Sequence, residues 1–267
     1  MACTSSCARP WPASLAGSSV APPATGREGR SPPVTFDVGV VVQSWDVFAR
    51  GLGLTILCCA SAIAAGLVLG AIVALGRLSR RGWLRGPASG YVEIVRDTPF
   101  LVQAFLIYFL LPRYSIRLPA TTAGVIALSI YAAAGFAEAI RGAVLSVPRG
   151  QVEAARATGM SHLLAMRRIV APQMMGYLIP SLTNQCIGIV KESAVLSIIT
   201  VPELTMASAL VLGQTFAALE AYSVVAVLYW GLTVSIALGM GVLERRTGSH
   251  RPVGGRLAPL VSGSRES

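Results

Sequence analysis

The chain has 267 residues, of which 54% are hydrophobic and only 13% are charged. This charged fraction is about half of that in a typical soluble protein, which argues against a soluble globular domain and indicates a membrane protein with several spans. The net charge of +10 comes almost entirely from arginines in short blocks beside apolar segments, so we expect membrane lipid rather than nucleic acid as their partner.

The first 34 residues are rich in Pro, Ser, Gly and Ala and have no periodic apolar pattern, which predicts a disordered tail. They lack the apolar core of a signal peptide, although a start codon assigned too far upstream would give the same composition. Phe36 to Arg50 follows as an amphipathic lead-in. We expect one transmembrane domain over residues 35–246 and a second disordered tail over 247–267.

The first span is predicted from Leu52 to Gly76, about 37 Å of helix against a hydrocarbon core of about 30 Å. Within it, Gly66 and Gly70 form a Gly-xxx-Gly pair that would let a neighbouring helix approach closely. An arginine block follows and marks the cytoplasmic side: Arg77, Arg80, Arg81 and Arg85.

The residues from Tyr91 to Pro99 lead into a second span that runs to about Leu111, with Pro99 in its first helical turn. A third span is predicted from Ala120 to about Ile140. It contains Glu138, three residues before Arg141, so the two side chains share one helix face. We interpret Glu138 as a structural ion-pair partner, with a role in transport as the alternative.

A polar, basic stretch over residues 147–173 separates the third span from the fourth and must project from the membrane, because unpaired charge and backbone are costly in hydrocarbon. Val152 to Thr158 favours helix, and Gly159 can end it in a left-handed turn. Ser161 is expected to cap a second short helix that stops at Pro172. Two such helices make a compact knob suited to docking on a soluble partner.

In this stretch a Glu-Ala-Ala triplet is followed at fixed spacing by Gly159, Ile169 and Pro172. The spacing resembles the EAA loop of permease subunits of bacterial ABC importers, which engages the ATPase. The resemblance implies an ATPase-coupling role for a set of residues: Gly150, Gln151, Glu153, Ala154, Ala155, Gly159, Ile169 and Pro172. The alternative is a surface helix-turn-helix without a special role.

The fourth span, Met174 to about Val201, is the most polar one. Its polar residues recur at steps of three and four and share one stripe: Ser181, Asn184, Gln185, Gly188, Lys191 and Glu192. Polar side chains in a bilayer normally face a protein interior or a water-filled cavity, so the stripe, apart from its glycine, is the candidate wall of a translocation path. A polar seam between subunits that never touches solute is the alternative.

The segment from Thr205 to Ala221 has no basic residue and fits an external connection, and Tyr222 to Leu243 predicts the fifth span. With the N-terminus outside, the inner segments hold most arginines, whereas the short outer connections hold only Arg113 and Arg117. This asymmetry favours an N-out, C-in topology with the stretch 147–173 in the cytoplasm.

The resemblance continues in register from about Gly51 to Arg246. At three places the chain is similar to the polar amino acid branch of these permeases: Thr98-Pro99 with Gln103, the residues around Glu138, and Lys191-Glu192-Ser193. This branch includes the permeases for histidine and glutamine. Asp97 stands where that family usually has Gly, and Glu192 where it has Asp.

The resemblance implies an all-α membrane protein of about five transmembrane helices, with the type I, MetI-like architecture, in the bacterial inner membrane. It further implies import of a polar amino acid by two permease subunits, an ATP-binding cassette ATPase that hydrolyses the ATP, and an extracytoplasmic substrate-binding protein. Cationic, acidic and amide amino acids, and homodimer and heterodimer, all remain open.

Motifs for chemistry are missing: no P-loop precedes Lys191, the only lysine, no Gly-x-Ser-x-Gly is present, and neither His162 nor His250 has partners at metal-ligand spacing. We therefore expect no catalytic residue, no cofactor and no metal. A second hypothesis is a membrane-embedded assembly or anchoring protein that docks a cytosolic partner without moving solute; the polar stripe argues against it. A membrane hydrolase is a third.

Overall fold

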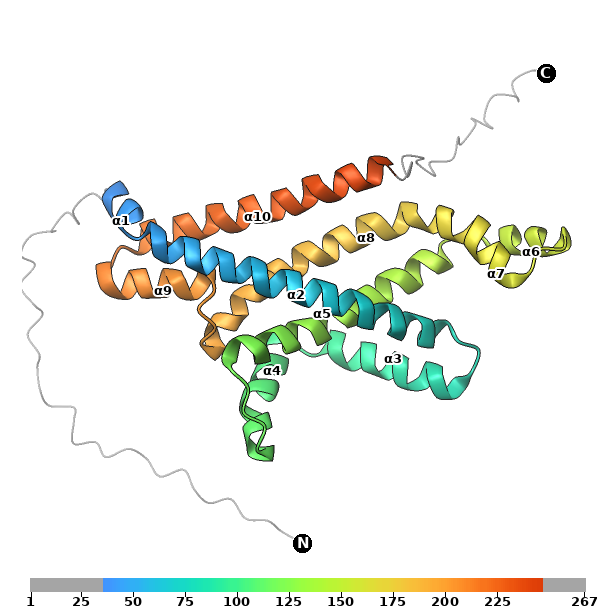
Figure 1. The fold of residues 1–267 in the computed structure, drawn as a ribbon, viewed down its shortest axis with the longest axis horizontal. Helices are drawn as coiled ribbons and strands as arrows, with labels where there is room; N and C mark the ends of the chain where they lie inside the picture. The colour runs from blue at the N-terminus through green and yellow to red at the C-terminus, as the bar shows by residue number, and fades with distance from the viewer. Residues whose placement is uncertain (1–35, 247–267) are drawn as a thin grey trace, which may run out of the picture. The chain divides into compact units, whose positions relative to one another are not determined.

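The computed structural model describes residues 36–246, and within them the chain is helical, without strands (Figure 1). The two predicted tails lie outside the described residues. All the helices belong to one compact unit that starts at Asp37.

Helix α2 (Trp45–Leu78) follows the short α1 (Val38–Gln43) and forms its most extensive contact with α5 (Ala120–Leu145). It is longer than the predicted first span, because the second part of the lead-in, from Trp45 to Arg50, belongs to the same helix, while Ser44 separates the first part as α1. A Cβ on Gly66 would lie 2.6 Å from the Cβ of Ala132, and one on Gly70 would lie 2.8 Å from that of Phe136. The glycine pair therefore lets α2 and α5 approach closely, as predicted.

The predicted second span is bent rather than straight. Its first part is α3 (Gly82–Asp97). Its second part is α4 (Phe100–Phe105), continued by the turns η2 (Leu106–Leu110) and η3 (Leu111–Tyr114). The chain bends by 106° between the two parts. Proline disfavours a helical conformation in the residue before it, and Thr98 is extended, with φ −101° and ψ 132°. Pro99 is thus the N-cap of α4, one residue before the first helical turn in which it is predicted.

The polar stretch folds as α6 (Arg149–Ala157) and α7 (His162–Ala165), and α7 continues through the π turn η4 (Met166–Val170) into α8 (Ala171–Glu192). The expectation that Pro172 stops the second helix is wrong. Pro172 lies in the first turn of α8, directly after a π turn whose wider spacing relieves the clash of a proline ring with the preceding turn.

The last part of the chain contains η5 (Ser193–Ile199), α9 (Leu204–Thr215) and α10 (Ala218–Arg246). The predicted external connection is largely helix α9, because the fully buried Glu203 caps it, accepting hydrogen bonds from the backbone N–H groups of Thr205 and Met206. Its carboxylate also accepts a 2.8 Å hydrogen bond from the Tyr229 hydroxyl of α10.

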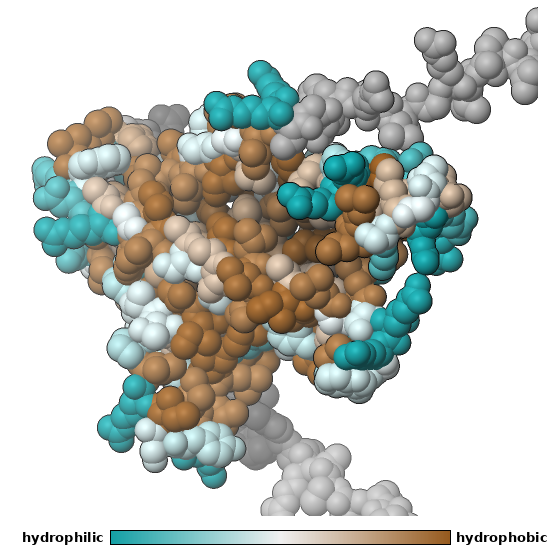
Figure 2. Space-filling model, turned by 45° about the vertical axis from the view of Figure 1, so that its right-hand side comes forward, coloured by the Kyte–Doolittle hydropathy of each residue, from teal (hydrophilic) through white to brown (hydrophobic). Residues whose placement is uncertain are grey.

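In residues 36–246, three helices are long and apolar enough to cross a membrane, namely α2, α5 and α10, and the number is up to five if each bent pair forms one span. In the second bent pair, the chain bends by 49° between His162–Ile199 and Leu204–Thr215. This agrees with the five predicted spans. Figure 2 shows a broad apolar surface with hydrophilic residues gathered at its borders, as a bilayer requires.

Candidate functional site

The knob predicted in the polar stretch is present. At the end of α6, Gly159 has a φ of +84°, the N–H of Gly159 donates to the Arg156 carbonyl, and the N–H of Met160 donates to the Ala155 carbonyl. This pairing is the Schellman motif, which needs a left-handed residue at its centre. Ser161 caps the next helix, as predicted, by accepting a 3.3 Å hydrogen bond from the N–H of Leu164.

The predicted coupling residues have two kinds of position in the knob. Ala155 is buried and Ile169 half-buried, so these two pack the knob against the rest of the chain. The others are exposed: Gly150, Gln151, Glu153, Ala154, Gly159 and Pro172. Leu163 is 80% exposed on the same knob. An exposed acid on one short helix and an exposed leucine on the next are suited to a groove on a partner.

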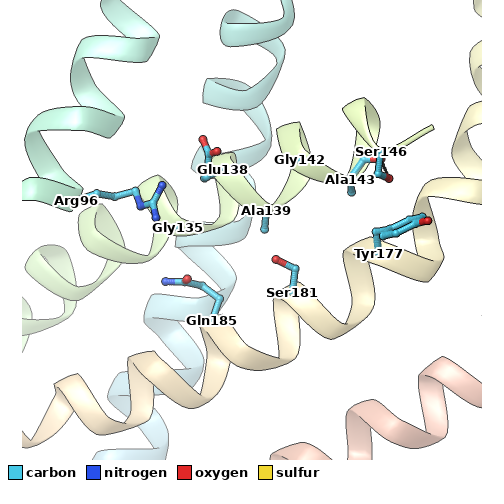
Figure 3. A pocket seen from close by; sticks show the side chains of 10 residues that line it. All are labelled: Arg96, Gly135, Glu138, Ala139, Gly142, Ala143, Ser146, Tyr177, Ser181 and Gln185. Carbon is cyan, nitrogen blue, oxygen red and sulfur yellow. Dashed lines mark hydrogen bonds between the residues drawn. The ribbon is translucent and has the colours of Figure 1, made fainter. Parts of the chain in front are cut away.

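A pocket of about 290 Å³ opens between α3, α5 and α8. Ten residues line it: Arg96, Gly135, Glu138, Ala139, Gly142, Ala143, Ser146, Tyr177, Ser181 and Gln185 (Figure 3). Of the predicted translocation residues, the structure brings only Ser181 and Gln185 into this lining. Glu192 is half-buried outside it, while Asn184 and Lys191 are exposed.

Helix geometry explains this division of the polar stripe. Successive residues turn by about 100°, so Ser181, Gln185 and Glu192 fall within about 40° of one another, whereas Asn184 and Lys191 lie about 60–80° to one side of Ser181. The edge of the stripe with Ser181 and Gln185 therefore lines the pocket, and the edge with Asn184 and Lys191 is exposed on this subunit.

The predicted ion pair between Glu138 and Arg141 is present, with 3.1 Å between the arginine Nε and a carboxylate oxygen. A second partner was not predicted: Arg77, at the end of α2, also binds the Glu138 carboxylate. The side chain of Arg77 is only 12% exposed. Glu138 thus ties α2 to α5 and has a cation on each of its oxygens.

The bend between α3 and α4 is held by side chains. Pro99 lies four residues after Val95 and has no N–H, so the Val95 carbonyl loses its helical donor. The Gln103 amide supplies the donor instead, at 2.7 Å, and also donates to the Thr98 carbonyl at 2.9 Å. The bend places Arg96, at the end of α3, at the pocket, a position that the sequence did not reveal.

Gln185 fits into the pocket wall because residue 135 has no side chain. A Cβ on Gly135 would lie 2.6 Å from the Gln185 amide oxygen, closer than atoms in contact allow. Figure 3 shows Gln185 and Ser181 on α8 facing α5 across the pocket. Their neutral hydrogen-bonding groups and the Arg96 guanidinium can hold a small polar solute; they form no catalytic constellation.

Comparison with known proteins relates this arrangement to transport. Residues 66–249 match the family described as "Binding-protein-dependent transport system inner membrane component". The "Probable glutamine ABC transporter permease protein GlnM" of Bacillus subtilis (strain 168) is 36% identical over 211 residues, which are 79% of this chain and 98% of that protein.

Two solved structures have the same fold. A crystal structure of an amino acid ABC transporter with histidines matches with a TM-score of 0.75 and 36% identity, over 79% of this chain and 99% of that one. The MetNI methionine ABC transporter, in inward-facing conformations, matches with a TM-score of 0.64 and 23% identity, over 77% and 98% of the two chains.

Proposed function

Since the chain belongs to the family of binding-protein-dependent transport system inner membrane components, we propose that its solute passes the pocket between α3, α5 and α8 and that its knob couples this passage to ATP hydrolysis on another subunit. The chain is the permease subunit of an ABC transporter that imports a polar amino acid across the bacterial inner membrane. The family match supports this role over the hypothesis of a membrane anchor.

The observation that carries the coupling proposal is the Schellman turn at Gly159, which ends α6 in a defined turn directly before α7 and leaves Glu153 and Leu163 exposed. Because α7 continues through η4 into α8, a movement of the knob passes directly to a helix of the pocket. A docked ATPase that closes on ATP would thus shift the population between inward- and outward-facing states.

We place the path along the Ser181 edge of α8, with solute delivered by an extracytoplasmic binding protein. The opposite edge supports a second permease subunit, either another copy of this chain or a related one. Asn184 and Lys191 are exposed on a membrane helix, and a charged side chain facing lipid is costly. A partner subunit, or a water-filled path between the two, would remove that cost.

The test is copurification of the tagged chain from native membranes in mild detergent. We expect an ABC ATPase with the wild type and distinctly less of it with Glu153→Lys, because the reversal places a cation in a groove formed for an acid. Asp46→Lys is the matched control, an exposed charge reversal at the start of α2. Equal recovery of the ATPase with all three chains, or its absence from wild-type complexes that retain other subunits, would reject the docking role of the knob.

A further inference from the structure

Among the residues that the structure describes, the pocket lining has one cation without an ion-pair partner, and its single acid is paired. Among its lining residues only Arg96 and Glu138 are charged. Arg141 binds both oxygens of Glu138 and Arg77 binds one of them, so the cluster of these three residues carries a net positive charge. Figure 3 shows the Glu138 carboxylate turned away from Ser181 and Gln185.

Arg96 differs from these arginines, because within residues 36–246 it forms no ion pair. Its guanidinium extends toward the Gly135 side of α5 in Figure 3. Glu192 is the acid of α8 on the same edge as Ser181. Glu192 does not line the pocket, nor do the exposed acids of α3, Glu93 and Asp97.

The remaining polar groups of the lining are neutral. Ser146, Tyr177, Ser181 and Gln185 offer hydroxyl and amide groups that can donate or accept hydrogen bonds. The volume, about 290 Å³, lies just below the range of about 300–1,000 Å³ for pockets that hold drug-sized ligands, which suits a single amino acid.

These charges restrict the solute. A guanidinium binds a carboxylate through two parallel hydrogen bonds, and a second cation in the pocket would be repelled by Arg96, which is exposed on this chain, and by the Glu138 cluster. We propose that Arg96 receives the α-carboxylate and that the pocket selects against cationic side chains, so that the transported class is an amino acid with a neutral or acidic side chain. This inference rests on the proposed function, in which the pocket lies on the solute path.

The test is direct binding to the purified permease–ATPase complex without a binding protein, which would otherwise impose its own selectivity. Radiolabelled glutamine, glutamate, arginine and lysine are titrated by equilibrium dialysis. We expect saturable binding of glutamine or glutamate, and dissociation constants about tenfold or more higher for arginine and lysine because of like-charge repulsion. Arginine or lysine binding as tightly as glutamine, or no saturable binding in a complex that transports, would overturn the inference.

Two substitutions test the charge argument itself. Arg141→Gln releases one oxygen of Glu138 and adds negative charge at the pocket, so arginine binding should strengthen relative to glutamine. Arg141→Lys keeps the charge and should keep the wild-type preference, and Arg113→Gln, which changes an exposed arginine outside the pocket, is the matched control. An unchanged arginine-to-glutamine ratio in Arg141→Gln complexes that still contain the ATPase would contradict the proposed selectivity.

Arg96→Gln should weaken binding of every amino acid, since it removes the carboxylate partner. Import into proteoliposomes that hold the permease, the ATPase and the binding protein distinguishes a failure of the proposed function from a failure of the proposed selectivity. If no amino acid is imported, the proposed function fails; if import occurs while the dialysis shows no preference against cations, only the selectivity fails.

Discussion

Gly135 is the residue on which the position of Gln185 depends. An alanine Cβ there would overlap the end of the Gln185 side chain, which is flexible and can move away. We expect Gly135→Ala to change the free energy of unfolding by less than about 1 kcal/mol, because a rotamer change relieves the overlap. The displaced amide should raise the KM for uptake several-fold at unchanged protein level.

Gly53→Ala is the matched control, because a Cβ on Gly53, in α2, meets nothing within 4 Å. Uptake kinetics in proteoliposomes and thermal unfolding of the purified complex measure the two effects. The same KM in both variants would mean that Gln185 does not contribute to solute binding.

Glu138 has a structural role that can be measured apart from selectivity. Its replacement by Gln leaves Arg77 and Arg141 without a counter-charge, and Arg77 is nearly buried. Loss of charge-assisted hydrogen bonds of this kind costs about 1–3 kcal/mol, so Glu138→Gln should lower the thermal midpoint of the complex. Glu93→Gln, an exposed acid of α3, should leave the midpoint unchanged; equal midpoints in the two variants would show that the tie between α2 and α5 adds no stability.

At the scale of elements, the bend between α3 and α4 depends on Gln103. Gln103→Leu would leave the carbonyls of Val95 and Thr98 without these donors, at about 1–3 kcal/mol for each carbonyl. We expect lower thermal stability and lower uptake, because Arg96 is positioned by the bend. Val102→Leu, at the exposed neighbouring position, should resemble the wild type. Full uptake and stability in Gln103→Leu would mean that packing alone holds the bend.

The ends of the helices around Gly159, Pro172 and Pro99 show which parts of these elements are predictable from sequence. Gly159 and Ser161 were assigned correctly, because a left-handed turn and an N-cap depend on adjacent residues. Pro172 was not, because a π turn before it allows the helix to continue. At Pro99, a straight span and a bend both satisfy the local pattern, and the bend needs the Gln103 amide to reach Val95, eight residues away.

The pocket was only half predictable for a related reason. Periodicity identifies the polar stripe of α8 but not which edge faces α5, since that depends on how the helices pack. Arg77 is 61 residues from Glu138, and Arg96 joins the lining only through the bend. Residues that meet through tertiary packing leave no signal in a single sequence.

At the scale of the whole unit, the transmembrane helices have two ends of different character. At one end lie α1 and the α9–α10 turn, and at the other lie α6 and α7 (Figure 1). The first end is fastened by the hydrogen bond from the Asp37 N–H to Glu220, at 2.9 Å, and by that from the Leu204 N–H to Thr55, at 3.1 Å. The second end carries the exposed arginines of the knob. The positive-inside rule then assigns the knob to the cytoplasm.

This orientation predicts a labelling pattern in intact cells. In a chain whose native cysteines are replaced by serine, Gln214→Cys, exposed near the end of α9, should react with a membrane-impermeant maleimide added outside. Ala157→Cys, exposed on the knob, should react only after the membrane is permeabilised. Because both positions are exposed on the chain itself, denatured samples give the same full labelling and serve as the control. Labelling of Ala157→Cys from outside would invert the topology, and with it the side on which an ATPase can dock.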